Sequence, residues 1–137
     1  MGLLQVFDIA GSGMSAQSVR LNTVSSNMAN ANNVSSSADD VYRAKNPVFA
    51  TLMSNMQQDE ASAGVQVTKI IESNSKAIQR YEPHNPLANE EGYIFQTNVN
   101  VIEEMANMIS ASRSYQNNVE ILNTAKQLML ATLKIGQ

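Results

Sequence analysis

The sequence predicts a mainly α-helical chain with a small β module, in which long N- and C-terminal helices form a coiled-coil-like pair with short strands and loops between them. Near each end, apolar residues recur at alternating steps of four and three, as expected for a helix that winds around another. Between the ends, short stretches alternate between apolar and polar residues, which is typical of strands. We therefore expect a helix over 1–33, a β-rich module over 34–97 and a second helix over 98–137.

The N-terminal helix is predicted from an apolar seam of about 28 residues, or roughly 40 Å of helix. Gly11 and Gly13 interrupt it, at a cost of about 1 kcal/mol each relative to Ala. Either the helix bends there or another backbone approaches closely, and the sequence leaves both explanations open. The Asn-rich run 27–33 is expected to end the helix, because Asn tolerates the left-handed conformation. The seam consists of Leu3, Phe7, Ala10, Met14, Gln17, Leu21, Val24, Met28 and Ala31.

The central segment is predicted to contain a polar linker, several short strands and two loops. The linker covers 35–40, and a loop tip is expected over 54–63. A turn-rich loop over 83–93 leads into the last strand. The predicted strands cover 41–45 and 48–52 on either side of Pro47, then 64–70, 77–82 and 93–95.

The C-terminal helix is predicted over 99–135 from a second seam. A further stripe of Ile121, Leu128 and Ile135 falls outside that seam, and Leu130 lies outside both. Pairing the two helices would cover one seam on each and leave the further stripe bare. A chain of 137 residues has too little material to cover it, so we expect other copies or other proteins to do so. The seam consists of Val101, Met105, Met108, Ser112, Tyr115, Val119, Leu122, Lys126, Met129 and Leu133.

Composition argues against several classes of function. Charged residues make up 15% of the chain, the net charge is −3, and no Lys/Arg cluster could neutralise phosphates, so no nucleic-acid partner is expected. The chain has no cysteine, which leaves no disulfide and no thiolate metal site. No apolar run approaches about 18 residues, so no direct membrane span is expected. The N-terminus lacks the basic region of a secretory signal peptide.

Neither catalysis nor metal binding is predicted. His84 is the single histidine and lies between two prolines, where a loop residue is a better explanation than a ligand. Glu103 and Glu104 fall in the first turn of the C-terminal helix, where acids favour the positive end of the helix dipole. Phosphate-binding, serine-hydrolase and zinc-protease motifs do not occur. We expect no enzyme activity and no cofactor.

Three stretches occur in the order NTVSSNMANAN at 22–32, YEPHNPLANEEGYI at 81–94 and MISASRSYQNNVEILNT at 108–124. The first and third resemble the two terminal motifs of the bacterial flagellar axial proteins, the rod and hook group. The second is similar to a loop shared by proximal rod subunits. The stretch FDIAGSGM at 7–14 and the short chain agree with a proximal rod subunit.

The resemblance implies a structural subunit of the proximal rod, the drive shaft that crosses the periplasm and encloses the export channel. It implies a homo-oligomer that polymerises helically through its terminal helices and contacts other proximal and distal rod subunits and the rod-to-ring adaptor. It also implies export by the flagellar type III export apparatus without a cleaved signal peptide. A non-flagellar secreted helical-hairpin interaction module is the alternative, and it would need only one seam per helix.

The residues expected at subunit interfaces come from the seams, the further stripe and the terminal motifs. Arg113 is expected to pair with an acid of a neighbour or with amides of the 27–33 turn, although a solvated Arg113 beside a seam Tyr115 explains the pattern too. The expected interface residues are Leu3, Phe7, Met14, Leu21, Val24, Asn27, Asn30, Met105, Met108, Arg113, Tyr115, Val119, Ile121, Leu122, Leu128, Met129 and Leu133.

Overall fold

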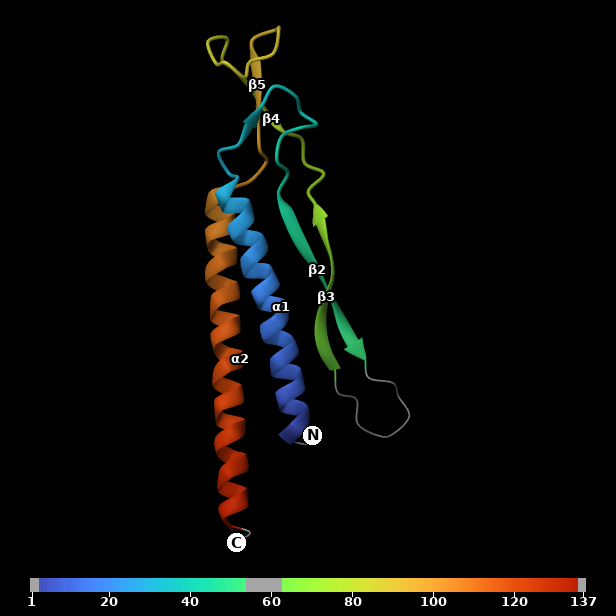
Figure 1. The fold of residues 1–137 in the computed structure, drawn as a ribbon, viewed down its shortest axis with the longest axis vertical. Helices are drawn as coiled ribbons and strands as arrows, with labels where there is room; N and C mark the ends of the chain where they lie inside the picture. Colours follow the sequence, from blue (N-terminus) through green and yellow to red (C-terminus); the bar gives the residue numbers. More distant parts are fainter. Residues whose placement is uncertain (1–2, 54–62, 136–137) are drawn as a thin grey trace.

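The computed structural model describes residues 3–53 and 63–135, and its fold is mainly helical with small antiparallel sheets, as predicted. Figure 1 shows an elongated molecule in which α1 lies between α2 and the pair β2–β3. Strands β1, β4 and β5 and the loop 82–92 form one end. In chain order the elements are α1 (Leu3–Ala29), β1 (Val34–Ser35), β2 (Lys45–Met53), β3 (Ala63–Glu72), β4 (Ile78–Tyr81), β5 (Tyr93–Gln96) and α2 (Val101–Ile135).

The two helices pack side by side and run in opposite directions (Figure 1). α1 ends in the Asn-rich turn, where the backbone N–H of Asn30 donates to the carbonyls of both Ser26 and Asn27. α2 begins two residues later than predicted because Asn100 caps it. The Oδ1 atom of Asn100 accepts hydrogen bonds from the backbone N–H groups of Ile102 and Glu103, at 3.1 and 3.4 Å.

Every second position of the seam predicted for α2 lies one residue after the residue that packs on α1. Met105 and Lys126 are exposed, and the half-buried Ser112 and Val119 only flank the face that packs on α1. The prediction missed the second column of this face because alanine, Asn and Glu occupy it, and a search for apolar side chains favours larger residues. The buried and half-buried row follows Glu104, Met108, Ala111, Tyr115, Asn118, Leu122, Ala125 and Met129.

At the glycines of α1, a close approach is observed only at Gly13, and the group that approaches is a side chain of the same chain and not another backbone; nothing lies within 4 Å of a Cβ atom placed on Gly11. α1 is uninterrupted across Gly11 and Gly13. A Cβ atom on Gly13 would lie 2.8 Å from Nδ2 of Asn118 on α2. On the other side of α1, the Oγ atom of Ser12 accepts a hydrogen bond from the backbone N–H of Val65 on β3 at 3.2 Å. α1 is therefore held closely on both sides.

The strands differ from the prediction in two places. β2 is one continuous strand that includes Pro47, with a bulge after Val48, and the expected strand over 41–45 is mostly loop. Proline is tolerated because β2 pairs only with β3 and has a free edge. β1 overlaps the start of the expected linker at Ser35, and it pairs with β5 through Val34 and Ser35. Most of the predicted loop tip, 54–62, lies outside the described residues.

Candidate assembly surface

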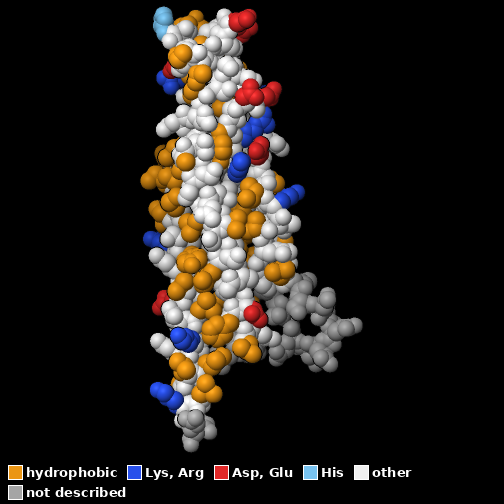
Figure 2. Space-filling view, in the orientation of Figure 1, with side chains coloured by type: hydrophobic (Ala, Val, Ile, Leu, Met, Phe, Trp, Pro, Cys, Tyr) orange, Lys and Arg blue, Asp and Glu red, His pale blue; other side chains and the backbone are white. Residues whose placement is uncertain are grey.

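Large apolar side chains are exposed along much of α2. Figure 2 shows hydrophobic side chains along the length of the molecule, and residues of the described chain that are fully buried are mainly small. Scattered exposed apolar residues are ordinary, but contiguous stripes mark interaction sites. The exposed large apolar residues of α2 are Val101, Ile102, Met105, Ile109, Ile121, Leu128, Leu130 and Leu133.

One stripe, called the outer stripe here, consists of Ile102, Met105 and Ile109. Steps of three and four place these residues on one face of α2, roughly opposite the row that packs on α1. Ile102 is 80% exposed. Arg113 follows one turn after Ile109, is exposed, and forms no hydrogen bond or ion pair within the described part of the chain. Pairing of Arg113 with the 27–33 turn is absent from this chain, so an acid of a neighbour stays the prediction.

A groove of about 640 Å³ lies between α1 and the second half of α2. Ile121 and Leu128, two members of the further stripe predicted from the sequence, line it together with Val6 of α1. The stripe therefore faces an open hollow, and both residues remain about half exposed. The other lining residues are Asn117, Glu120, Thr124 and Ala125.

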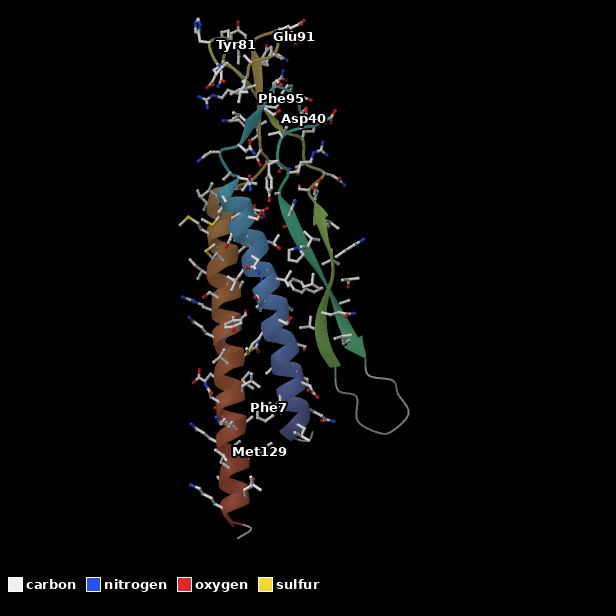
Figure 3. The ribbon with its side chains drawn as sticks, viewed as in Figure 1. Phe7, Asp40, Tyr81, Glu91, Phe95 and Met129 are labelled. Carbon is white, nitrogen blue, oxygen red and sulfur yellow. The ribbon has the colours of Figure 1, made fainter. Side chains whose placement is uncertain are left out.

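The end of α2 continues beyond α1 (Figure 1). Figure 3 shows Phe7 and Met129 at the lower end of the two helices, where the described part of α1 begins. Leu133 was predicted to lie in the seam, but it is 63% exposed, because the described part of α1, which begins at Leu3, does not cover it. Leu130 is exposed beside it. The last turns of α2 thus present leucines without cover from the described chain.

Other residues expected at subunit interfaces lie between the helices of this chain or beside that contact. They are half-buried or buried, so they contribute to holding α1 against its neighbours inside the subunit. The side chain of Leu3 lies outside the description. The Nδ2 atom of Asn30 donates to the Ser26 carbonyl at 2.8 Å, within the same helix end. The half-buried or buried set is Phe7, Met14, Leu21, Val24, Met108, Tyr115, Val119, Leu122 and Met129.

Asn27 has a role that the sequence analysis missed. Its side chain is 0% exposed. Its Nδ2 atom donates to the carbonyl of Lys45 at 2.8 Å, while its Oδ1 atom accepts from the backbone N–H of Lys45 and from the hydroxyl of Tyr42, both at 2.9 Å. The amide pairs with the first residue of β2 as a neighbouring strand would. The sequence signal that could have indicated this role is the position of Asn27, a polar residue about one turn after the seam residue Val24.

A second amide completes this junction. The Oδ1 atom of Asn98 accepts from the backbone N–H of Ala44 at 2.8 Å, and its Nδ2 atom donates to the carbonyl of Ser75 at 3.0 Å. Buried main-chain groups require partners. The two amides therefore join the end of α1, the start of β2 and the segment before α2, and they fix how the strands lie against the helices.

The single histidine of the sequence and the acidic residues were the candidates for chemistry. His84 is exposed in the loop 82–92, and no group of three His, Cys, Asp or Glu residues in ranges 3–53 and 63–135 could hold a metal ion. No described helix combines the length and apolar character needed to cross a membrane. The surfaces that stand out are apolar and face outward.

Two protein-family models match the chain. The model described as flagella basal body rod protein matches residues 7–35, and the model of the flagellar basal body rod FlgEFG protein C-terminal matches residues 90–135. The chain is 51% identical to the flagellar basal-body rod protein FlgC of Escherichia coli O157:H7 and 50% identical to that of Salmonella typhimurium. It is 42% identical to that of Buchnera aphidicola subsp. Acyrthosiphon pisum. Each comparison covers 100% of both chains.

Proposed function

Because the chain belongs to the family of the flagellar basal-body rod protein FlgC, we propose that it polymerises helically through α1 and α2 as part of the proximal rod. The chain is a structural subunit of the flagellar basal-body rod and is not an enzyme. In the proposed assembly the two helices form a coiled-coil-like unit, and many such units enclose the export channel. Torque passes along the rod through their repeated contacts, as the rod crosses the periplasm.

The observation that carries this proposal is the exposed apolar surface of α2. The outer stripe, the groove and the end of the helix lie on different sides of α2, so one partner could not cover all three. Burying a large aliphatic side chain contributes about 1.5–3 kcal/mol. The outer stripe alone therefore contributes several kcal/mol per subunit when a neighbour covers it. A helical-hairpin module that works alone or as a dimer would leave most of this surface in water.

The proposed neighbours are other copies of this chain, the other proximal rod subunits, the distal rod subunits and the adaptor that joins the rod to the inner-membrane ring. The flagellar type III export apparatus delivers the chain to its site of assembly in this proposal. Support comes from the family and from the exposed stripes on α2, which need several partners.

The test is a charged substitution on the outer stripe. Ile109→Asp should leave the isolated subunit folded, because Ile109 is exposed, but should prevent neighbours from covering the stripe. Ser110→Asp is the matched control, because it adds the same charge at the next exposed position of the helix. Expected results are loss of swimming and basal bodies without a complete rod for Ile109→Asp only. Normal rods in both variants would contradict the proposed packing.

A further inference from the structure

One acidic side chain at the start of α2 is buried without a partner. Glu104 lies in the first turn of the helix and is 6% exposed. Its Oε2 atom is enclosed and forms no hydrogen bond, and its carboxylate forms no ion pair with any described residue. Because burying an ionised group without a partner is costly, this carboxylate requires an explanation.

The helix dipole does not explain why Glu104 is buried. Acidic side chains in the first turn stabilise a helix because they face the positive end of its dipole. The exposed Glu103 lies in the same turn and makes this interaction while its carboxylate stays in water. Burial adds a desolvation cost to the interaction of Glu104 with the dipole. The free subunit therefore holds this charge in the interior at a cost that Glu103 avoids.

Glu104 lines a pocket of about 300 Å³, called the junction pocket here. The pocket is formed by α1, by β2 on one side of α1 and by the start of α2 on the other (Figure 1). Its apolar lining consists of Val24, Pro47 and Phe49, and Phe49 is 39% exposed. A side chain from outside the subunit can therefore find both apolar and polar contacts there. The other lining residues are Arg20, Lys45, Asn46 and Asn107.

Two cationic side chains of the junction pocket have donors to spare. The Nη2 atom of Arg20 donates to Oδ1 of Asn107 at 2.9 Å, and the Nζ atom of Lys45 lies 5.6 Å from the centre of the Tyr42 ring. Neither cation forms an ion pair within residues 3–53 and 63–135. A guanidinium has five N–H donors and an ammonium has three. The pocket thus contains an acceptor without a donor, on Glu104, and donors without acceptors.

We infer that the junction pocket binds the side-chain amide of an Asn or Gln residue from a neighbouring subunit of the rod. An amide donates through its NH₂ group and accepts through its carbonyl oxygen, so it can donate to Glu104 and accept from Arg20 or Lys45. A carboxylate would place a like charge beside Glu104, and a cationic side chain would place one beside Arg20 and Lys45. This inference rests on the proposed polymerisation and names the chemistry of one contact within it.

The first test is Glu104→Met, which removes the carboxylate and keeps an unbranched side chain of similar length. The Tm of the purified subunit should stay the same or rise, because an unpaired buried charge is lost. The number of complete rods in isolated basal bodies should fall about tenfold, because a hydrogen bond from the neighbour to a charged group is lost. Glu103→Met is the matched control, since it removes the same charge from an exposed position of the same turn, and its rods should be normal.

A second test identifies the neighbour. Phe49 is replaced by the photoreactive p-benzoylphenylalanine, which places a cross-linking ring in the lining of the junction pocket, and isolated basal bodies are irradiated. We expect a cross-link to a neighbouring rod subunit, at a peptide in which Asn or Gln lies beside the linked residue. Adding Glu104→Met should lower the yield of this product about tenfold. Adding Glu103→Met should leave the yield unchanged.

Several results would overturn the inference. A lower Tm for Glu104→Met would show that the carboxylate stabilises the subunit itself. Normal rods in that variant, no cross-link from position 49, or a linked peptide without Asn or Gln would each rule out an amide in the pocket. Ile109→Asp tests the proposed packing of α2 separately, because Ile109 does not line the junction pocket. The two proposals can therefore fail independently.

Discussion

Replacing Asn27 by Ala should weaken the attachment of β2 to α1 and lower the stability of the subunit. The side chain makes three hydrogen bonds, two of them to the backbone of Lys45 and one to the Tyr42 hydroxyl. Each contributes a net 0.5–1.5 kcal/mol or so, and interior partners left unpaired cost more. We expect the free energy of unfolding to fall by about 3 kcal/mol. For a chain of this length that corresponds to a decrease in Tm of about 10 °C.

The measurement is urea unfolding of the purified subunit followed by far-UV circular dichroism, with the m-value checked for constancy. Asn22→Ala is the matched control, because Asn22 is exposed on the same helix. Its removal should change stability by less than about 0.5 kcal/mol, with a slight gain from helix propensity. If Asn27→Ala costs no more than Asn22→Ala, the amide does not anchor β2 and our account of the junction fails.

Three further outcomes test the packing. Gly13→Leu should destabilise the subunit by about 1–3 kcal/mol in a urea titration, because its side chain would overlap Asn118; unchanged stability would refute close helix contact there. Leu122→Asp should lower Tm in the isolated subunit, because Leu122 lies between the helices, and an unchanged Tm would place it elsewhere. Hydrogen exchange should be fast in α2 beyond Met129 and slow across the row that packs on α1, and equal protection would contradict the exposed end.

The helices could be predicted from the sequence because long periodic segments give a strong signal. Both were expected, but α1 ends four residues before the end of the expected range 1–33, and α2 begins three residues after the start of the expected range 98–137. The helix contact was harder, because its closest points use residues that carry little apolar signal. Gly13 leaves room for the side chain of Asn118, and Ala111 is fully buried; a periodicity of large side chains reports neither of them. The pattern of apolar residues therefore indicates which faces of a helix are hydrophobic. It does not indicate which of those faces packs on the other helix.

The junction at β2 could not be predicted because it depends on contacts distant in sequence. Asn27 and Lys45 are 18 residues apart, and Ala44 and Asn98 are 54 apart. An Asn near a helix end is usually a cap. The Asn-rich run therefore indicated only where α1 ends. β1 was missed for a related reason. Two residues in a Ser-rich segment form a strand only because β5 provides its pairing partner.

The distribution of side-chain size explains why this chain suits a polymer better than a free globule. Small residues occupy the closest points of the helix contact, so the subunit is slender and its helices can approach each other closely. Large apolar residues remain on the outside of α2, where neighbouring subunits bury them in the proposed assembly. In this proposal, the buried apolar residues stabilise the folded subunit, and the exposed apolar residues of α2 stabilise the assembly. In the proposed assembly, the subunit gains further stability when neighbours bury these residues.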